Sequence, residues 1–189
     1  MEGKVYHGSP HEGITELKRN VSTHGKLCVY ATDNEAIALE FMGRGNGDLD
    51  TVKSLEDGKP VLVERRPGVF NQLYNKSGYL YEIDGKDFEH YDFLWDAEVI
   101  SFKDEKVEKC TKIDNVMDAL NKKEEEDQIT IYRYPDRPKE IPLDNSDLIE
   151  KYERFQKNGM PDAMDKLLSV YPELKEKIDN NQEESKHIK

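Results

Sequence analysis

The sequence predicts an α+β fold followed by C-terminal helices. Short apolar runs rich in β-branched and aromatic residues recur through the first 135 residues, which is the pattern of strands. Only two convincing helical segments interrupt these runs, and the last part of the chain is helical in pattern throughout. Because strands and helices do not alternate regularly, the order of elements argues against a doubly wound parallel sheet.

The first forty residues predict two strands and two helices. The strand "KVYHG" ends at the turn residues Ser9 and Pro10, and the strand "LCVYAT" leads directly into "NEAIALEFM", a run of good helix formers. Asp33 or Asn34 can cap that helix. A short helix is expected before it, since Ile14 and Leu17 stand at helical spacing, with a polar loop between. The expected ranges are strands over 4–8 and 27–32, helices over 12–17 and 34–42, and a loop over 18–26.

The middle of the chain predicts a series of strands around a single helix. Three glycines in residues 43–47 end the early helix, and because they neither follow a strand nor open a helix they are no dinucleotide fingerprint. The acidic residues of 48–57 are expected in a solvated loop. The expected elements are strands from Pro60 and over 78–84, 97–102, 106–113 and 128–134, and a helix over 114–127.

The domain organisation predicted is an α+β domain over 1–135, a helical appendage over 144–180, and a frayed tail over 181–189. The connector "PDRPKEIP" separates the first two. Within the appendage, "LIEKYERF" carries an apolar stripe at helical spacing that needs a surface to pack on. The appendage is therefore the region expected to meet a protein partner.

Composition excludes several function classes. The net charge of −12 argues against a general nucleic-acid binder, because phosphate contacts need clustered lysine and arginine. No stretch has the length and apolarity of a membrane span, and the N-terminus lacks the features of a secretory signal. Cys28 and Cys110 show no pairing pattern, and the scattered histidines suggest no metal site. These features predict a cytoplasmic protein.

Two short stretches carry the strongest functional signal. The first is "YHGSP" at residues 6–10, and the second is "VYATDNEAIALEF" at residues 29–41. Together they resemble the ADP-ribosyltransferase superfamily of the histidine-tyrosine-glutamate class, which includes diphtheria-toxin-like toxins and the catalytic domains of poly(ADP-ribose) polymerases. The likeness is closest over residues 5–41 and looser to about residue 110. It implies a split β-sheet core with a cleft that holds NAD as a substrate.

The resemblance also implies roles for individual residues. His7 is expected to hydrogen-bond a ribose hydroxyl of the adenosine, while Gly8 lets the backbone come close. Tyr30 is expected to stack on the nicotinamide ring, and Phe41 to close its other side. The NAD-binding residues expected are His7, Gly8, Ser9, Tyr30, Ala31, Thr32 and Phe41.

The third element of the class is a glutamate on a later strand, which stabilises the oxocarbenium-like ribose as nicotinamide leaves. Glu98 in "WDAEVISF" is the expected catalytic residue because it opens a strand after an aromatic turn. Glu64, Glu82 and Glu105 stay open as alternatives. The sequence by itself also allows an interpretation without a functional role, in which Glu98 is a surface charge on an edge strand.

Three functions follow as hypotheses. The first is transfer of ADP-ribose from NAD to an acceptor, or hydrolysis of NAD. The second is a non-catalytic nucleotide-binding or protein-interaction module on the same fold. The third is an RNA 2′-phosphotransferase, which needs basic residues to grip a phosphorylated RNA end, and apart from Arg65 and Arg66 the core is not basic. Residues 42–58 are expected to recognise the acceptor.

Overall fold

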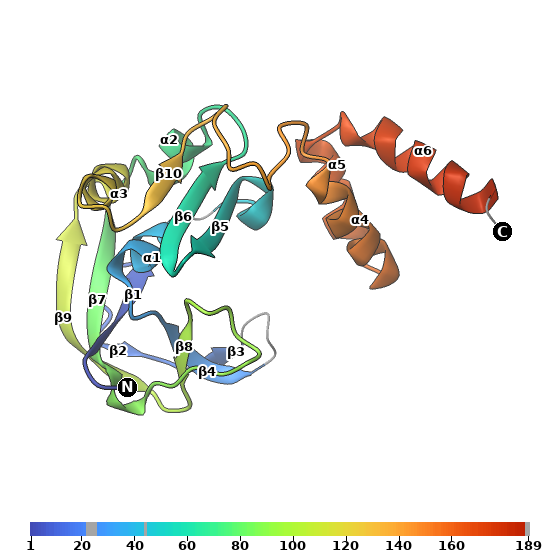
Figure 1. Ribbon diagram of the computed structural model, residues 1–189. Helices are drawn as coiled ribbons and strands as arrows, with labels where there is room; N and C mark the ends of the chain where they lie inside the picture. The colour runs from blue at the N-terminus through green and yellow to red at the C-terminus, as the bar shows by residue number, and fades with distance from the viewer. Residues whose placement is uncertain (22–25, 44, 188–189) are drawn as a thin grey trace.

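The computed structural model describes residues 1–21, 26–43 and 45–187, with only the backbone for residue 48 and residues 181–187. The α+β prediction is confirmed: a curled set of antiparallel strands forms the body, and helices follow at the C-terminus (Figure 1). Within the described residues, the strands form three hydrogen-bonded sheets.

The largest sheet carries the N-terminal strand at its edge. All its pairings are antiparallel, and His7 stands opposite Tyr81 in the register. Its apolar face contributes Val5 and Ile83 to a core that also contains Val29 and Val99 of the neighbouring sheet. The strands in order across the sheet are β1 (Lys4–Ser9), β7 (Gly78–Asp84), β9 (Glu105–Ile113) and β2 (Glu16–Leu17).

A second antiparallel sheet consists of β3 (Asn20–Val21), β4 (Leu27–Ala31) and β8 (Val99–Ser101). A single bridge joins it to β1: the amide of Tyr6 donates to the Thr32 carbonyl at 2.7 Å, and the amide of Thr32 donates back at 3.0 Å. β1 and β4 therefore meet at one point and then diverge.

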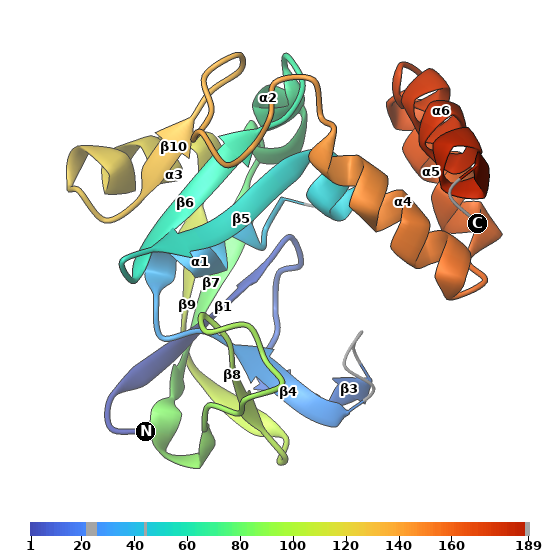
Figure 2. The same cartoon turned by 45° about the vertical axis from the view of Figure 1, so that its right-hand side comes forward.

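The third sheet lies on the other side of helix α1 (Glu35–Glu40). Figure 2 shows α1 and β1 between the hairpin of this sheet and the β4–β8 pair. α1 begins at Asn34, whose side-chain oxygen accepts from the amides of Ala36 at 2.9 Å and Ile37 at 3.4 Å, so the capping prediction for this residue is confirmed. The sheet contains β10 (Thr130–Tyr132), β6 (Lys59–Glu64) and β5 (Thr51–Glu56), with β10 parallel to β6.

Two helices of the body, α2 (Val69–Tyr74) and α3 (Val116–Glu125), pack against α1 and β6. Their buried faces share one core with Leu39 of α1 and Leu62 of β6. Two short 3₁₀ helices, η1 (Gly47–Leu49) and η2 (Gly85–Asp87), contribute no residue to this core.

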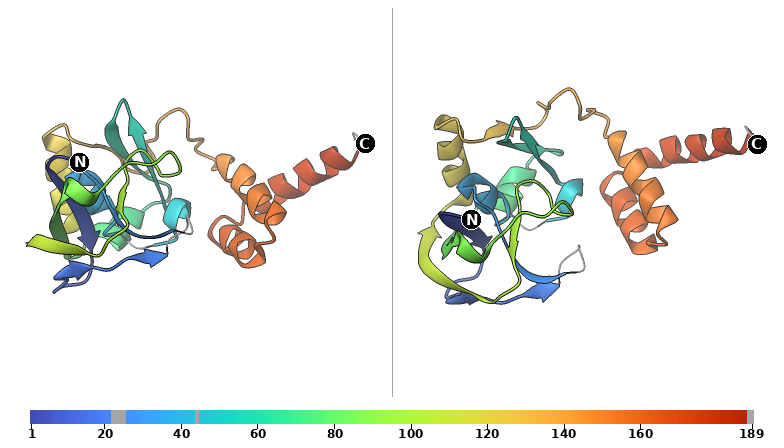
Figure 3. Two further views of the ribbon diagram at one scale, coloured as in Figure 1. Left: turned by 90° about the horizontal axis from the view of Figure 1, so that it is seen from below. Right: turned by 60° about the horizontal axis from the view of Figure 1, so that its bottom comes forward.

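Three helices follow the proline-rich connector. They pack on one another through the apolar stripe predicted from the sequence, and Leu148, Leu167 and Tyr171 are buried in this cluster together with Leu49 of the body. α6 extends away from the sheets (Figure 3). The helices are α4 (Asp147–Lys157), α5 (Pro161–Val170) and α6 (Leu174–His187).

A cluster of polar contacts, here named the joint, attaches these helices to the body. Arg65 donates to both carboxylate oxygens of Asp147, Arg66 donates to Asp50, and the Tyr171 hydroxyl donates to the Leu49 carbonyl. Arg65 and Asp50 are 5% and 3% exposed, so one member of each ion pair is buried, while Asp147 and Arg66 are partly exposed.

The structure corrects several predictions. Residues 16–17 form a strand where a helix was expected, because they pair with β9. Strand β5 was expected as loop, and helix α2 was missed. Asp50 is buried rather than solvated because Arg66 pairs with it. The segment expected to fray from residue 181 is helical as far as residue 187; residues 188–189 and part of the expected loop, 22–25, lie outside the description.

Over the part of the chain that is described, no helix combines the length and apolarity that crossing a membrane would require.

Candidate functional site

A pocket of 220 Å³ opens where β1, β4 and α1 meet. It lies beside the Tyr6–Thr32 bridge, where the two sheets part and leave space between their strand ends. Its lining residues are Tyr6, His7, Gly8, Tyr30, Ala31, Thr32, Ala38, Phe41 and Glu98.

The pocket brings together most of the residues expected from the sequence. His7 and Tyr30 both line it. Glu98 lines it too, although it stands 68 residues after Tyr30 in the sequence. Ser9 does not line it. Its hydroxyl instead accepts from the His11 amide at 3.1 Å, so Ser9 stabilises the turn after β1.

His7 and Tyr30 are in direct contact. Nδ1 of the imidazole lies 3.0 Å from the Tyr30 carbonyl oxygen. Because a carbonyl oxygen can only accept, this hydrogen bond assigns the proton to Nδ1. In a neutral imidazole, Nε2 is then the acceptor, and it can receive a hydrogen bond from a hydroxyl group.

Gly8 has a packing role that the sequence did not suggest. A Cβ atom at this position would lie 1.8 Å from the Ala38 carbonyl oxygen, a distance that no side chain can occupy. The glycine therefore lets β1 touch the backbone of α1. This contact brings Ala38 to the wall of the pocket.

Glu98 is placed by its neighbours in β8. It precedes Val99, which pairs with Ala31 of β4, so the register of the β4–β8 pair carries Glu98 to the strand end that holds Thr32. On its other side, the Glu98 amide donates to the Trp95 carbonyl at 2.8 Å and closes a turn.

The alternative acids are engaged elsewhere. Glu64 is 6% exposed and accepts from the amides of Phe70 at 2.8 Å and Tyr134 at 3.0 Å, so it ties β6 to the start of α2 and to the segment after β10. It does not line the pocket.

Glu82 and Glu105 likewise have structural contacts. Glu82 pairs with Lys4 and Lys109 on the strands either side of it, and these bonds lower its pKa, with the Lys109 hydrogen bond as the largest cause. Glu105 accepts from the Ser101 hydroxyl. Of the four acids, Glu98 alone is a lining residue of this pocket in the described part of the chain.

Aromatic rings form two sides of the pocket. Phe41, at the C-terminal end of α1, is 41% exposed although it is a large apolar residue, and its ring packs edge-on against Trp95. Tyr6 also lines the pocket, and the sequence analysis did not single it out. Burial, followed by the nearby Glu35 carboxylate, raises the pKa of Tyr6, so its phenol stays protonated at neutral pH.

The residues missed differ in how they could have been found. Tyr6 adjoins His7 in the motif, and Ala38 belongs to the alternation of small residues in "EAIAL", so both lay within the signal. Trp95 lies in a loop without regular structure, and no spacing rule connects it to Phe41.

The basic pair Arg65 and Arg66, which the sequence offered for a phosphorylated RNA end, lies apart from this pocket. Arg65 is held by Asp147 and Arg66 by Asp50, and both belong to the joint. Neither lines the pocket that holds His7.

Comparisons of the chain with models of known protein families, with curated proteins and with solved structures found no match. The site is therefore interpreted from its own geometry.

Proposed function

We propose that the chain binds NAD in this pocket and cleaves its nicotinamide–ribose bond, passing ADP-ribose to an acceptor or to water. The observation that carries the proposal is that one pocket is lined by His7, Tyr30 and Glu98 together. The three come from separate parts of the chain, and the resemblance in sequence predicts all three as site residues.

The dimensions of the pocket favour the nicotinamide end of NAD. Its 220 Å³ lies below the roughly 300–1,000 Å³ of pockets that enclose drug-sized ligands. It would therefore hold the nicotinamide and its ribose, while the remainder of the dinucleotide lies across the open mouth.

Each lining residue has a chemical role in this proposal. Nε2 of His7 accepts a hydrogen bond from a ribose hydroxyl, since Nδ1 is committed to the Tyr30 carbonyl. The rings of Tyr30 and Phe41 receive the nicotinamide, each such contact adding about 0.5–1.5 kcal/mol beyond area burial. Ala31 and Thr32 leave the space that the ring and sugar need, and Gly8 contributes its backbone to the lining.

Glu98 supplies the electrostatic part. As the bond breaks, nicotinamide leaves with the electron pair and C1 of the ribose becomes oxocarbenium-like. A carboxylate that bonds the ribose 2′-hydroxyl stabilises that positive charge. Removing a preorganised electrostatic contact costs roughly 2.7–4 kcal/mol, or about 10²–10³ in rate. The acceptor then adds to C1 and loses a proton.

NAD binding and nicotinamide release test the proposal together. At 100 times its dissociation constant a ligand stabilises the folded state by about 2.7 kcal/mol, which raises the melting temperature by roughly 5–10 °C for a chain of this size. His7→Ala and Tyr30→Ala should reduce this shift. Glu98→Gln should keep the shift and abolish release, because the acid acts mainly in the transition state.

Glu82→Gln is the matched control, since it removes a carboxylate that lies outside the pocket. It should change neither the shift nor the release. A well-folded protein with no shift at millimolar NAD would exclude the proposal. A shift without release would identify a nucleotide-binding module instead.

A further inference from the structure

The loop that carries Glu98 into the pocket is held at two places. Residues 91–98 form successive turns, with the Leu94 amide donating to the Tyr91 carbonyl at 2.9 Å and the Glu98 amide donating to the Trp95 carbonyl at 2.8 Å. Leu94 and Ala97 are buried and anchor the backbone. After Glu98 the chain joins β8 and is fixed by pairing with β4.

Trp95 packs this loop against Phe41, a residue that lines the pocket. Its ring centroid lies 6.3 Å from that of Phe41, with an angle of 76° between the planes. Edge-to-face pairs of this kind are favourable at 4.5–7 Å. Because Phe41 lines the pocket from α1, the contact spans from the helix to the turn that ends at Glu98.

We propose that Trp95 is the positioning residue for Glu98: its packing on Phe41 holds the turn that presents the glutamate to the pocket. The inference rests on the proposed function for its catalytic consequence. The turn places Trp95 and Glu98 at its first and fourth residues, whose Cα atoms lie within about 7 Å in a β-turn. A displacement at Trp95 is therefore transmitted to Glu98 directly.

The kinetic test separates positioning from binding. A misplacement of about 1 Å at a reacting centre can cost 10²-fold in rate. Trp95→Ala should therefore lower the rate of nicotinamide release at saturating NAD by about 10- to 100-fold. The thermal shift with NAD should stay near that of the wild type, since His7 and Tyr30 are untouched.

Trp95→Phe is the conservative variant, because a smaller ring can keep the edge contact, and it should restore most of the rate. Phe93→Ala is the matched control. It removes an aromatic ring from the same loop, and that ring stacks on Tyr91 at 5.5 Å and lies 5.9 Å from the Lys26 ammonium. Its rate should match that of the wild type.

The chain offers a readout of the contact that needs no NAD. Trp95 is its only tryptophan, so fluorescence excited selectively in tryptophan reports this residue alone. Phe41→Ala should expose the indole and move its emission to longer wavelength, while Phe93→Ala should leave it unchanged.

The outcomes distinguish the two proposals. Unchanged emission in Phe41→Ala would overturn the contact, whatever NAD does. Normal release by Trp95→Ala, with a wild type that turns over NAD, would overturn the positioning role and leave the proposed function standing. A wild type that neither binds NAD nor releases nicotinamide would overturn the proposed function, and with it any role of Trp95 in it.

Discussion

The pocket and the joint are both built from polar side chains that come together from distant parts of the chain, yet they use these side chains differently. In the joint, each guanidinium faces a carboxylate: Arg65 faces Asp147, and Arg66 faces Asp50. In the pocket, His7 of β1 and Glu98, which precedes β8, line one cavity together with the aromatic residues Tyr6, Tyr30 and Phe41.

The joint shows what matched charges do in this protein. Burial by itself would raise the pKa of Asp50, but hydrogen bonds from Asn46 and Arg66 lower it overall, so Asp50 stays ionised. Arg65 also donates to Asn145, which lies two residues before α4. Such groups hold elements of the fold in place, and their charges are paired with one another.

The difference gives a criterion for function in this chain. Glu64, Glu82 and Glu105 resemble the groups of the joint, because each is bonded to protein groups that it holds together. Glu98 is a lining residue of the pocket, and the other three acids are not. Lining a cavity, and not the presence of a carboxylate on a strand, is what separates the candidate acid from its alternatives.

The largest effect is expected in the joint. Arg65→Ala removes the buried partner of the Asp147 ion pair together with its hydrogen bond to Asn145, and should lower the free energy of unfolding by roughly 3 kcal/mol. The melting temperature should fall by roughly 6–12 °C, measured by thermal denaturation. If the joint and the pocket are independent, the Trp95 emission of the folded variant should equal that of the wild type.

Arg154→Ala is the control for this experiment, since Arg154 lies exposed on α4 and lines one surface pocket together with Arg65 and Asp147. Its effect should stay within about 0.5 kcal/mol. A change of Trp95 emission in Arg65→Ala would break the comparison, because the two regions would then be coupled.

Local patterns accounted for most of the fold. Strands β1, β4 and β7 and helix α1 follow from runs of apolar residues and from the cap at Asn34. β5 could not be predicted in the same way, because its sequence "TVKSLE" is half polar and it is an edge strand whose pairing with β6 stabilises it. The strand at residues 16–17 likewise depends on a distant partner, β9.

The candidate site, like the fold, could be predicted only in part from the sequence. His7 and Tyr30 were predictable because their strand ends carry a motif within one short stretch of chain. Glu98 was the expected acid, but the sequence left Glu64, Glu82 and Glu105 open because all four precede, follow or lie in strands. The structure adds that Glu98 lines the pocket with His7, whereas the other three do not. Ser9 shows the limit of a motif: it occupies the expected position and bonds to its own turn.

A second, smaller effect is expected at Glu40, which lies on α1 between the two regions. Its side chain is fully buried, and neither carboxylate oxygen has a hydrogen-bond partner among the described residues. Burial raises the pKa of Glu40 to about 8, with Lys53 opposing this in part. Tyr74 contacts its backbone carbonyl from α2.

The sign of the pH dependence follows from this shift. The unfolded chain ionises Glu40 near its ordinary pKa of 4.5, whereas the folded chain keeps the proton up to about pH 8. Glu40 therefore does not lower the free energy of unfolding below pH 4.5, where it is protonated in both states. Above pH 4.5 the free energy of unfolding falls as the pH rises towards 8. Glu40→Gln removes this loss.

The melting temperature of Glu40→Gln should thus rise relative to that of the wild type between pH 5 and pH 8, with the largest difference at the upper end. Thermal melts across this range are the measurement. A difference that stays constant with pH would mean that Glu40 is ionised in the folded protein, and that it belongs with the matched charges of the joint.

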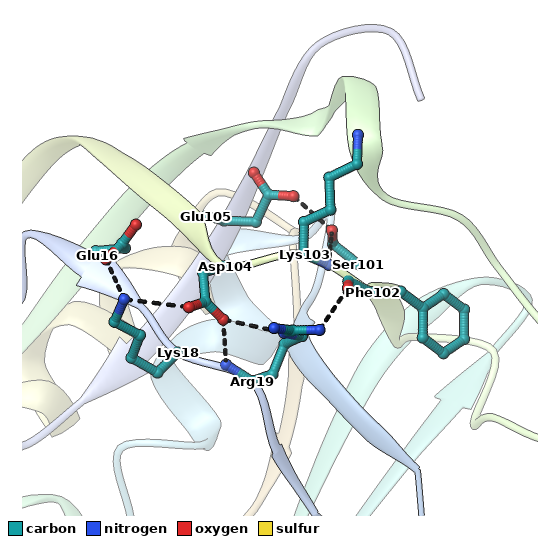
Figure 4. A network of polar contacts seen from close by, with 8 residues as sticks. All are labelled: Glu16, Lys18, Arg19, Ser101, Phe102, Lys103, Asp104 and Glu105. Carbon is teal, nitrogen blue, oxygen red and sulfur yellow. Dashed lines mark hydrogen bonds and ion pairs between the residues drawn. The ribbon is translucent and has the colours of Figure 1, made fainter.

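The smallest effect is expected in an exposed counterpart of the joint. Figure 4 shows Asp104 accepting from Lys18 and from both the amide and the guanidinium of Arg19, each at 3.1 Å, so that the turn before β9 is tied to the segment after β2. The Arg19 amide hydrogen bond, followed by the Lys18 and Arg19 side chains, lowers the pKa of Asp104 to about 2.

Asp104→Asn should reduce the melting temperature at pH 7 by about 2 °C or less, because exposed ion pairs contribute little and water screens them. A depressed pKa contributes stability above the unfolded value of 3.8 and loses it as the pH falls towards 2. The difference from the wild type should therefore vanish near pH 2 and shrink in high salt. A loss as large as that of Arg65→Ala would show that the number of contacts, and not burial, decides what a charged cluster contributes here.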